Sequence, residues 1–285
     1  MATNLQGGGE RGKPRASFLI EPAELEREMA LGDVLVVDSC KRPEYDRRHI
    51  PGAVHLSTYS NFVPDTTAAG MSAFAADMAS RHGAVGASRG RPIVVYENHT
   101  GMRATRALWI LEYLGHRNAR LLHGGLDAWV GAGGPVTAHA PGIQRAEFVP
   151  EVASGVLMSA DEINDRIGAR DLTVLDVRDA DEYAGRDQTP CCARRGHVPG
   201  AVWIAWTEFL QDGRFKSPEE IRKLLASRGV TEGSELTPYC HRGARSANAY
   251  YALRHAGITR VRNFIGSWHE WSARTHLPVE ITPRA

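Results

Sequence analysis

The sequence lacks the features of several protein classes. No apolar run approaches the roughly 20 residues of a membrane-spanning helix. Neither sign of charge is in excess, because 34 basic residues stand against 33 acidic ones and the formal net charge is +1. Electrostatics therefore gives no reason to expect a nucleic-acid or membrane partner. Residues 1–17 have no apolar central run, so we expect a flexible N-terminal tail there and not a secretory signal.

Cysteine is also scarce. The 285-residue chain has four cysteines, and two of them are adjacent, which does not suit a disulfide framework. We therefore expect reduced thiols and a cytoplasmic location. The four are Cys40, Cys191, Cys192 and Cys240.

The same series of motifs occurs twice along the chain. A short apolar run ends in Asp38, and a later one ends in Asp176. Each is followed by a Glu-Tyr pair and then by a His-x-Pro-Gly-Ala-Val block, which begins at His49 in the first copy and at His197 in the second. The second copy has ten more residues between tyrosine and histidine, including Cys191 and Cys192. Ordered blocks that recur in this way indicate a duplication.

The duplication predicts two α/β domains of ordinary size. Short apolar strands alternate with amphipathic helices, which is typical of a parallel sheet with helices on both faces. We place the domains at 18–137 and 156–285, with the polar residues 138–155 as their linker, and we expect the two halves to pack together. The strands are predicted at 34–37, 93–96 and 173–175, and the helices at 23–30, 104–114, 218–228 and 246–255.

The strongest chemical signal is the segment YCHRGARSA at residues 239–247. A strand ends, a short polar loop turns at Gly243, and a helix begins, so Cys240 faces backbone N–H groups and the positive end of a helix dipole. Basic neighbours add positive charge, and the pKa of the thiol should fall below its free value of roughly 8.5. A buried structural cysteine is the alternative, but charged neighbours oppose a dry location. These neighbours are His241, Arg242 and Arg245.

On these blocks, from about residue 18 to residue 281, the sequence resembles the tandem-domain rhodaneses, which are thiosulfate and 3-mercaptopyruvate sulfurtransferases. The shared features are the two aspartate-ended strands, the His-x-Pro-Gly-Ala blocks, the Cys240 loop and a glycine- and tryptophan-containing segment in each half. The resemblance implies a catalytic C-terminal domain. It also implies a silent N-terminal domain, because Glu97 stands where the second half has Cys240.

The resemblance further implies a mechanism. Cys240 takes the outer sulfur of a donor as a persulfide and passes it to cyanide or a thiol, with no metal and no organic cofactor. Arg242 and Arg245 would bind the oxyanion of the donor, His241 would line the entrance, and Asp176 would brace the loop from behind. The substrate-binding residues are then His241, Arg242, Gly243, Ala244, Arg245 and Ser246, with their backbone N–H groups stabilising the persulfide.

Basic residues after the cysteine favour thiosulfate as the donor within this family. One departure is Glu182, which stands where some thiosulfate-type members carry arginine. Arg186, Arg194 or Arg195 of the inserted segment could supply that cation. A 3-mercaptopyruvate-preferring enzyme and a carrier that delivers its persulfide to a protein partner stay open as alternatives.

Other features have less specific interpretations. A phosphatase or arsenate reductase would use Cys-x5-Arg, whereas only four residues separate Cys240 from Arg245. The shorter loop therefore argues against these two enzyme classes.

Cys191 and Cys192 are expected to be loop thiols, with metal ligation, a vicinal disulfide and sulfur acceptance as alternatives. His49 and His197 recur in both halves, which favours a structural role. The tryptophans are expected in the core or the domain interface, and Trp268 could instead wall the pocket; they are Trp109, Trp129, Trp203, Trp206, Trp268 and Trp271.

Overall fold

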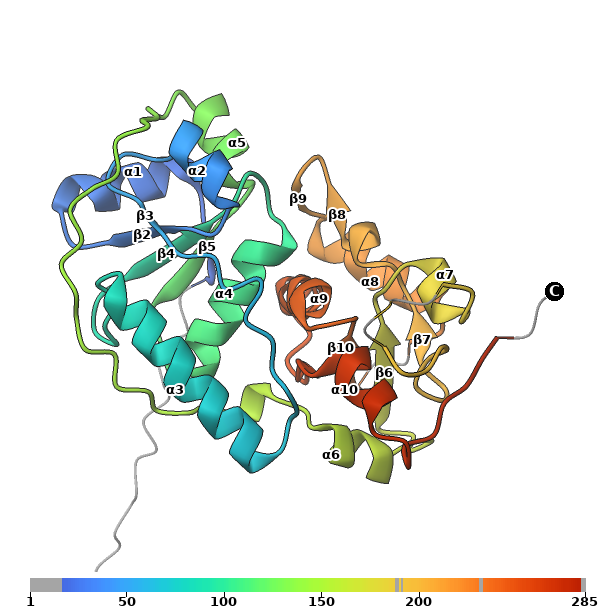
Figure 1. Ribbon diagram of the computed structural model, residues 1–285. Coiled ribbons are helices and arrows are strands. Elements are labelled where there is room, and N and C mark those ends of the chain that lie inside the picture. The colour runs from blue at the N-terminus through green and yellow to red at the C-terminus, as the bar shows by residue number, and fades with distance from the viewer. Residues whose placement is uncertain (1–16, 188–189, 191, 231–232, 283–285) are drawn as a thin grey trace, which may run out of the picture.

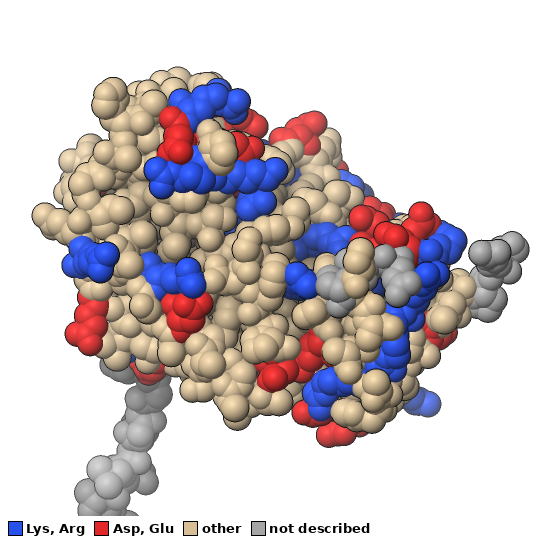
Figure 2. All heavy atoms as spheres, in the orientation of Figure 1, with Lys and Arg blue, Asp and Glu red and all other residues tan. Residues whose placement is uncertain are grey.

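The computed structural model describes residues 17–187, 190, 192–230 and 233–282. Two α/β halves lie side by side (Figure 1). On the face shown in Figure 2, basic and acidic side chains are interspersed. Among the described residues, no helix has the length and apolar character needed to cross a membrane. The expected tail, except for Ser17, and Cys191 fall outside the described residues.

The first half is built on a parallel sheet with the strand order β1-β5-β4-β2-β3. Its central strands β2 and β4 are buried along their whole length, as expected for strands covered on both faces. Val36 and Val94 point into one apolar cluster, while their neighbours Val37 and Val95 belong to another on the opposite face. The strands are β1 (Leu19–Ile20), β2 (Leu35–Asp38), β3 (Val54–His55), β4 (Ile93–Tyr96) and β5 (Ala119–Leu122).

Helices cover both faces of this sheet (Figure 1). Residues of α1 and α5 share a cluster with Val36 and Val94, and residues of α3 and α4 share the other. The predicted α/β class is thereby confirmed for this half. The helices are α1 (Pro22–Leu31), α2 (Arg42–Arg47), α3 (Ala68–Ala84), α4 (Met102–Tyr113) and α5 (Gly125–Gly131).

The second half repeats this topology with shorter outer strands. Three parallel strands have the order β10-β6-β7. Two isolated parallel bridges, Leu236 to Val261 and Leu157 to Asn263, extend the sheet in the positions that β5 and β1 occupy in the first half. The full strands are β6 (Leu172–Asp176), β7 (Val202–Trp203) and β10 (Glu235–Tyr239).

The connections of the second half differ more. The 3-10 helix η1 (Ser154–Val156) precedes the half, and η2 (Trp206–Phe209) leads into an antiparallel hairpin that has no counterpart in the first half. The helix predicted to begin at Ser246 begins two residues earlier, because Gly243 already serves as its N-cap. The hairpin is β8 (Leu210–Gln211) with β9 (Arg214–Phe215), and the helices are α6 (Ala160–Asp165), α7 (Ala180–Tyr183), α8 (Pro218–Ser227), α9 (Ala244–His255) and α10 (Ser267–Ala273).

The duplication extends to individual hydrogen bonds. The Nδ1 atoms of His49 and His197 each lie 2.8 Å from a tyrosine carbonyl, that of Tyr45 or Tyr183. In both halves the two rings stack at 3.9 Å between centroids. These contacts agree with the structural role predicted for the two histidines.

The two halves share one apolar core, centred on α4 and α9. Glu112 of α4 accepts hydrogen bonds from Tyr251 at 2.9 Å and Arg254 at 2.6 Å. At the other end, the backbone N–H of Thr100 donates to the carbonyl of Gly213 in the hairpin at 2.8 Å. Four tryptophans are buried and two are half-buried, in agreement with the packing role predicted for them; the buried ones are Trp109, Trp129, Trp268 and Trp271.

Candidate active site

The Cys240 loop lies between the end of β10 at Tyr239 and the start of α9 at Ala244. Gly243 adopts φ 83°, a left-handed conformation that favours glycine. A Cβ atom there would lie 2.5 Å from the carbonyl oxygen of Ile265. Glycine is therefore required both for the turn and for the close approach of the neighbouring segment.

Backbone N–H groups surround the sulfur. The N–H of Gly243 donates to Cys240 Sγ with an N–S distance of 3.1 Å. Burial would raise the pKa of this thiol. Its effect is outweighed by the charge of Arg245, by the N–H groups of Ser246 and Arg242 and by the Ser246 hydroxyl, so the pKa is lowered. The loop can therefore hold a thiolate, which is the nucleophilic form of cysteine.

Cys40 in the first half provides an internal comparison. It is also a buried free thiol. Burial raises its pKa, and the neighbouring carboxylates of Asp38, Glu97 and Glu44 raise it further. Two cysteines with the same burial thus differ in acidity because one faces N–H groups and arginine, and the other faces carboxylates.

Cys240 is only 1% exposed, so the expectation that basic neighbours keep it away from a buried location is wrong. The reason is geometric: the loop wraps around the sulfur, while His241, Arg242 and Arg245 are only partly buried. Cys240 touches the apolar core on one side and accepts the Gly243 N–H on the other.

Arg245 is held by carboxylates. Its guanidinium forms two hydrogen bonds with Glu182, at 2.6 and 3.0 Å, and one with Asp179 at 3.3 Å. Burial would raise the pKa of Glu182, but Arg245 lowers it below its ordinary value. The departure from the family at Glu182 therefore has a clear structural role, which is to orient Arg245 and balance its charge.

The arginines of the inserted segment are engaged elsewhere. Arg186 pairs with Asp181. The Arg194 guanidinium donates to four backbone carbonyls at and beyond the end of α10. Arg195 is exposed. The contacts of Arg186 and Arg194 thus do not support the suggestion that they replace the missing donor-binding cation.

The first half contributes a cation that sequence reasoning missed. Arg106 of α4 is fully buried and donates to the carbonyl oxygens of Arg242 at 2.7 Å and Thr58 at 3.4 Å. Burial lowers the pKa of Arg106 to about 10, and the negative charge on Cys240 opposes this. The only signal in the sequence was an arginine directly before the apolar run of residues 107–111. Arg242 in turn lies 4.2 Å from the ring centroid of Phe62, another residue of the first half.

Two further contacts support the loop from behind. Ser267, another residue missed from the sequence, has φ 57° and accepts the Cys240 N–H at 3.1 Å. Asp176 accepts the Tyr239 hydroxyl at 2.6 Å and the Arg178 N–H at 3.0 Å. Asp176 thus reaches the loop through the residue that precedes the cysteine. Trp268 packs over the Arg178 guanidinium at 4.7 Å and donates to the Arg194 carbonyl.

In the first half, a carboxylate fills the corresponding cradle. Glu97 Oε1 accepts the N–H groups of Arg103 at 2.7 Å and Ala104 at 2.9 Å, at the start of α4. In the second half, N–H groups at the start of a helix likewise face the sulfur, those of Gly243 and Ser246. A side chain without sulfur occupies the cradle of the first half, which agrees with a silent first half.

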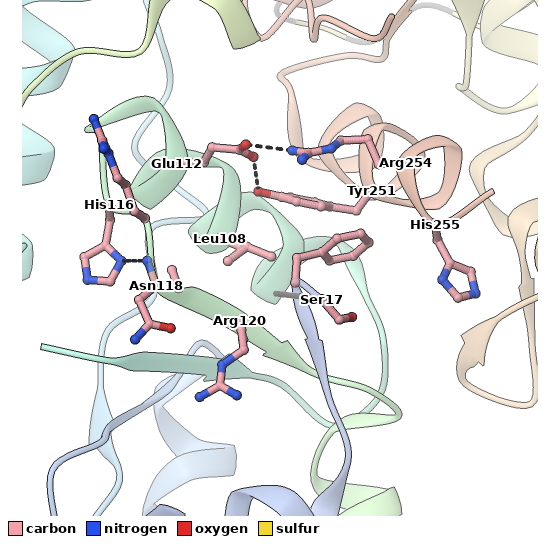
Figure 3. Close-up of a pocket in the computed structure, with 12 residues that line it drawn as sticks. Ser17, Leu108, Glu112, His116, Asn118, Arg120, Tyr251, Arg254 and His255 are labelled. Atoms are coloured by element: carbon pink, nitrogen blue, oxygen red, sulfur yellow. Dashed lines mark hydrogen bonds and ion pairs between the residues drawn. The ribbon is translucent and has the colours of Figure 1, made fainter. Parts of the chain in front are cut away.

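A cavity of about 310 Å³ lies elsewhere in the interface (Figure 3). It is lined by the later turns of α4 and α9, about 15 Å along α9 from the Cys240 loop at 1.5 Å per residue. Two of the arginines that line it are in ion pairs: Arg254 with Glu112, and Arg120 with Glu24. It contains no cysteine, so the chemistry of the Cys240 loop does not take place there.

Comparison with known proteins identifies the class to which this fold and loop belong. The rhodanese-like domain family matches residues 21–132 and 159–274. The chain therefore belongs to the rhodanese family. Relatives that match most of its length are thiosulfate sulfurtransferases, so the chain is a sulfurtransferase.

Individual relatives cover most of the chain. It is 29% identical over 265 residues to a thiosulfate sulfurtransferase of Pseudomonas aeruginosa, covering 93% of this chain and 97% of the relative. It is 30% identical to the 3-mercaptopyruvate sulfurtransferase of Mus musculus, covering 82% and 80%. It is also 30% identical to the sulfur carrier protein TtuD of Thermus thermophilus, covering 82% and 86%. A crystal structure of a probable thiosulfate sulfurtransferase shares 32% identity and a TM-score of 0.70, covering 87% and 98%.

Proposed function

We propose that this sulfurtransferase moves a sulfane sulfur from thiosulfate to a thiol or cyanide through a persulfide on Cys240. One observation carries the proposal: Cys240 Sγ accepts the Gly243 N–H at 3.1 Å in a loop that opens directly into α9. N–H groups in this arrangement stabilise negative charge on sulfur, both in the thiolate and in the persulfide.

The reaction has two steps. The Cys240 thiolate attacks the outer sulfur of thiosulfate, a sulfur–sulfur bond forms, the original one breaks, and sulfite leaves with its electron pair. The acceptor anion then attacks the terminal sulfur of the persulfide and restores the thiolate. The bound sulfur atom is the carrier throughout, so the loop residues only bind, orient and stabilise charge.

The positive charge around the loop favours thiosulfate, which is a dianion. Arg242 is part of the loop, and Arg106 is buried behind it with backbone carbonyls as its partners. Arg245 contributes less to donor binding than the sequence suggests, because Glu182 and Asp179 already hold it. We therefore assign the donor oxyanion mainly to Arg242 and to the N–H groups of the loop. A comparison of kcat/KM for thiosulfate and 3-mercaptopyruvate tests this, and preference for the second donor would refute it.

Mass spectrometry tests the persulfide directly. Wild-type protein incubated with thiosulfate should gain one sulfur atom, on the peptide that contains Cys240. Cys240→Ser should lose both the adduct and the turnover, whereas Cys40→Ser, which removes a buried thiol of the other half, should keep both. Turnover retained by Cys240→Ser would place the nucleophile elsewhere.

A second candidate is a carrier that delivers its persulfide to one protein partner, and the similarity to a sulfur carrier protein favours it. Multiple turnovers with cyanide would argue for the enzyme. A single sulfur load that only a protein acceptor discharges would argue for the carrier. A cytoplasmic location, inferred from the reduced thiols, remains a prediction in either case.

A further inference from the structure

Three side chains from distant segments meet beside the Cys240 loop. Cys192 lies in the inserted segment, His241 follows the nucleophile, and His269 belongs to α10. One sulfur or ring-nitrogen atom of each lies within 4.8 Å of those of the other two. Cys192 is buried and the two histidines are half-buried, so the group is largely shielded by the protein.

Backbone contacts hold the three segments together. The His269 N–H donates to the His241 carbonyl at 3.0 Å. The Trp268 indole N–H donates to the Arg194 carbonyl at 3.1 Å, two residues beyond Cys192. The Arg194 guanidinium also donates to carbonyls at the end of α10, including that of Trp271 at 2.8 Å. The insertion that carries Cys192 is therefore fastened to the helix that carries His269.

A thiolate with two imidazoles is a donor set that suits zinc. Tetrahedral zinc with its usual bond lengths separates such ligand atoms by about 3.5 Å. Atoms that already lie within 4.8 Å of one another reach this spacing by side-chain movements of about 1 Å. The group contains no carboxylate, so it offers little to magnesium or calcium.

We propose that Cys192, His241 and His269 bind one thiophilic divalent cation of the zinc type, with an exogenous ligand in the fourth position. The Cys192 proton is released to solvent when the cation binds. The sequence argued against a metal because adjacent cysteines fit one tetrahedron poorly, whereas this site uses Cys192 with histidines 49 and 77 positions away. Since His241 adjoins Cys240, a bound cation fixes the rim of the loop and slows sulfur transfer.

Cobalt provides a spectroscopic probe of the site. Chelator-treated full-length protein should bind one equivalent of Co²⁺, with a thiolate-to-cobalt charge-transfer band and the intense visible bands of tetrahedral cobalt, and Zn²⁺ should displace it. Cys192→Ser and His269→Gln should each weaken binding more than about 100-fold, since even outer-shell partners are worth about 10–100-fold in metal affinity. The matched controls Cys40→Ser and His276→Gln should bind as wild type does.

The nucleophile variant separates this site from the catalytic one. Cys240→Ser should keep the charge-transfer band, because the thiolate ligand is Cys192. Loss of the band in Cys240→Ser together with its retention in Cys192→Ser would overturn the proposal, and so would the lack of a one-to-one complex in wild type. Zinc should slow turnover reversibly in wild type but not in Cys192→Ser. Unchanged turnover in zinc-loaded protein would overturn the link to the Cys240 loop.

Discussion

The ion pair between Arg245 and Glu182 allows the acidity of Cys240 to be tested separately from the stability of the fold. Both side chains are largely buried, with 15% and 10% of their surface exposed. Arg245→Met should raise the pKa of Cys240, because the charge that lowers it most is removed while burial remains. Below that pKa, each unit of increase reduces the thiolate fraction about tenfold. The rate of sulfur transfer near neutral pH should fall accordingly.

Arg245→Met also leaves the Glu182 carboxylate buried without its partner. Breaking a buried pair in this way costs about 3–5 kcal/mol, whereas neutralising both partners is often nearly neutral. At a few degrees per kcal/mol, the single variant should melt about 10 °C below wild type. The double variant Glu182→Gln/Arg245→Met should recover most of that stability but not the acidity of the thiol.

The assay is the pH dependence of Cys240 alkylation in chelator-treated protein, with thermal unfolding measured in parallel. A double variant whose thiol titrates as in wild type would refute the reasoning, because the N–H groups would then suffice. The pH dependence of stability gives a second check. Arg245 depresses the pKa of Glu182 below 4.5, so the ion pair makes its full contribution to folding stability above that pH. This contribution is lost as the pH falls through the depressed value, so the stability of wild type relative to the double variant should fall over the same pH range.

Three further outcomes are expected. A non-glycine residue in the left-handed conformation destabilises the folded protein by about 1–2 kcal/mol. Gly243→Ala should lower the free energy of unfolding by more than this, because its Cβ would lie 2.5 Å from a carbonyl oxygen. Gly257→Ala, with φ 86° and open space around it, should lower it by that amount only, as measured by thermal unfolding. Tyr239→Phe and its counterpart Tyr96→Phe should each lower the free energy of unfolding by about 1–3 kcal/mol, since each leaves a buried N–H group without its acceptor. Only Tyr239→Phe should also alter turnover. Arg106→Met should lower kcat/KM for thiosulfate several-fold, and an unchanged value would show that the first half does not assist the loop.

Much of the fold could be predicted from the sequence because the patterns involved are local. The buried strands β2, β4 and β6 and helix α8 lie within one or two residues of their predicted positions. Helix α8 carries a capping box between Ser217 and Glu220, a signal that involves only neighbouring residues. The Cys240 loop follows from the same local logic, since a strand, a glycine turn and a helix in succession create the cradle.

The burial of the sulfur and the role of Glu182 could not be predicted in this way. Both depend on which side chains the packing brings against the loop. Glu182 lies 63 positions before Arg245, and Arg106 lies 136 positions before Arg242. These contacts cannot be inferred from the pattern of apolar and polar residues within either half.

The chain alone thus specified a duplicated α/β protein and predicted a reactive cysteine in its second half, because strand, turn and helix signals act over a few residues. The packing of α4 against α9 settled which charges surround that cysteine, and the fastening of the insertion onto α10 brought Cys192 to two histidines. Electrostatic contacts of this kind act through space, so they arise only when segments far apart in sequence are folded against one another.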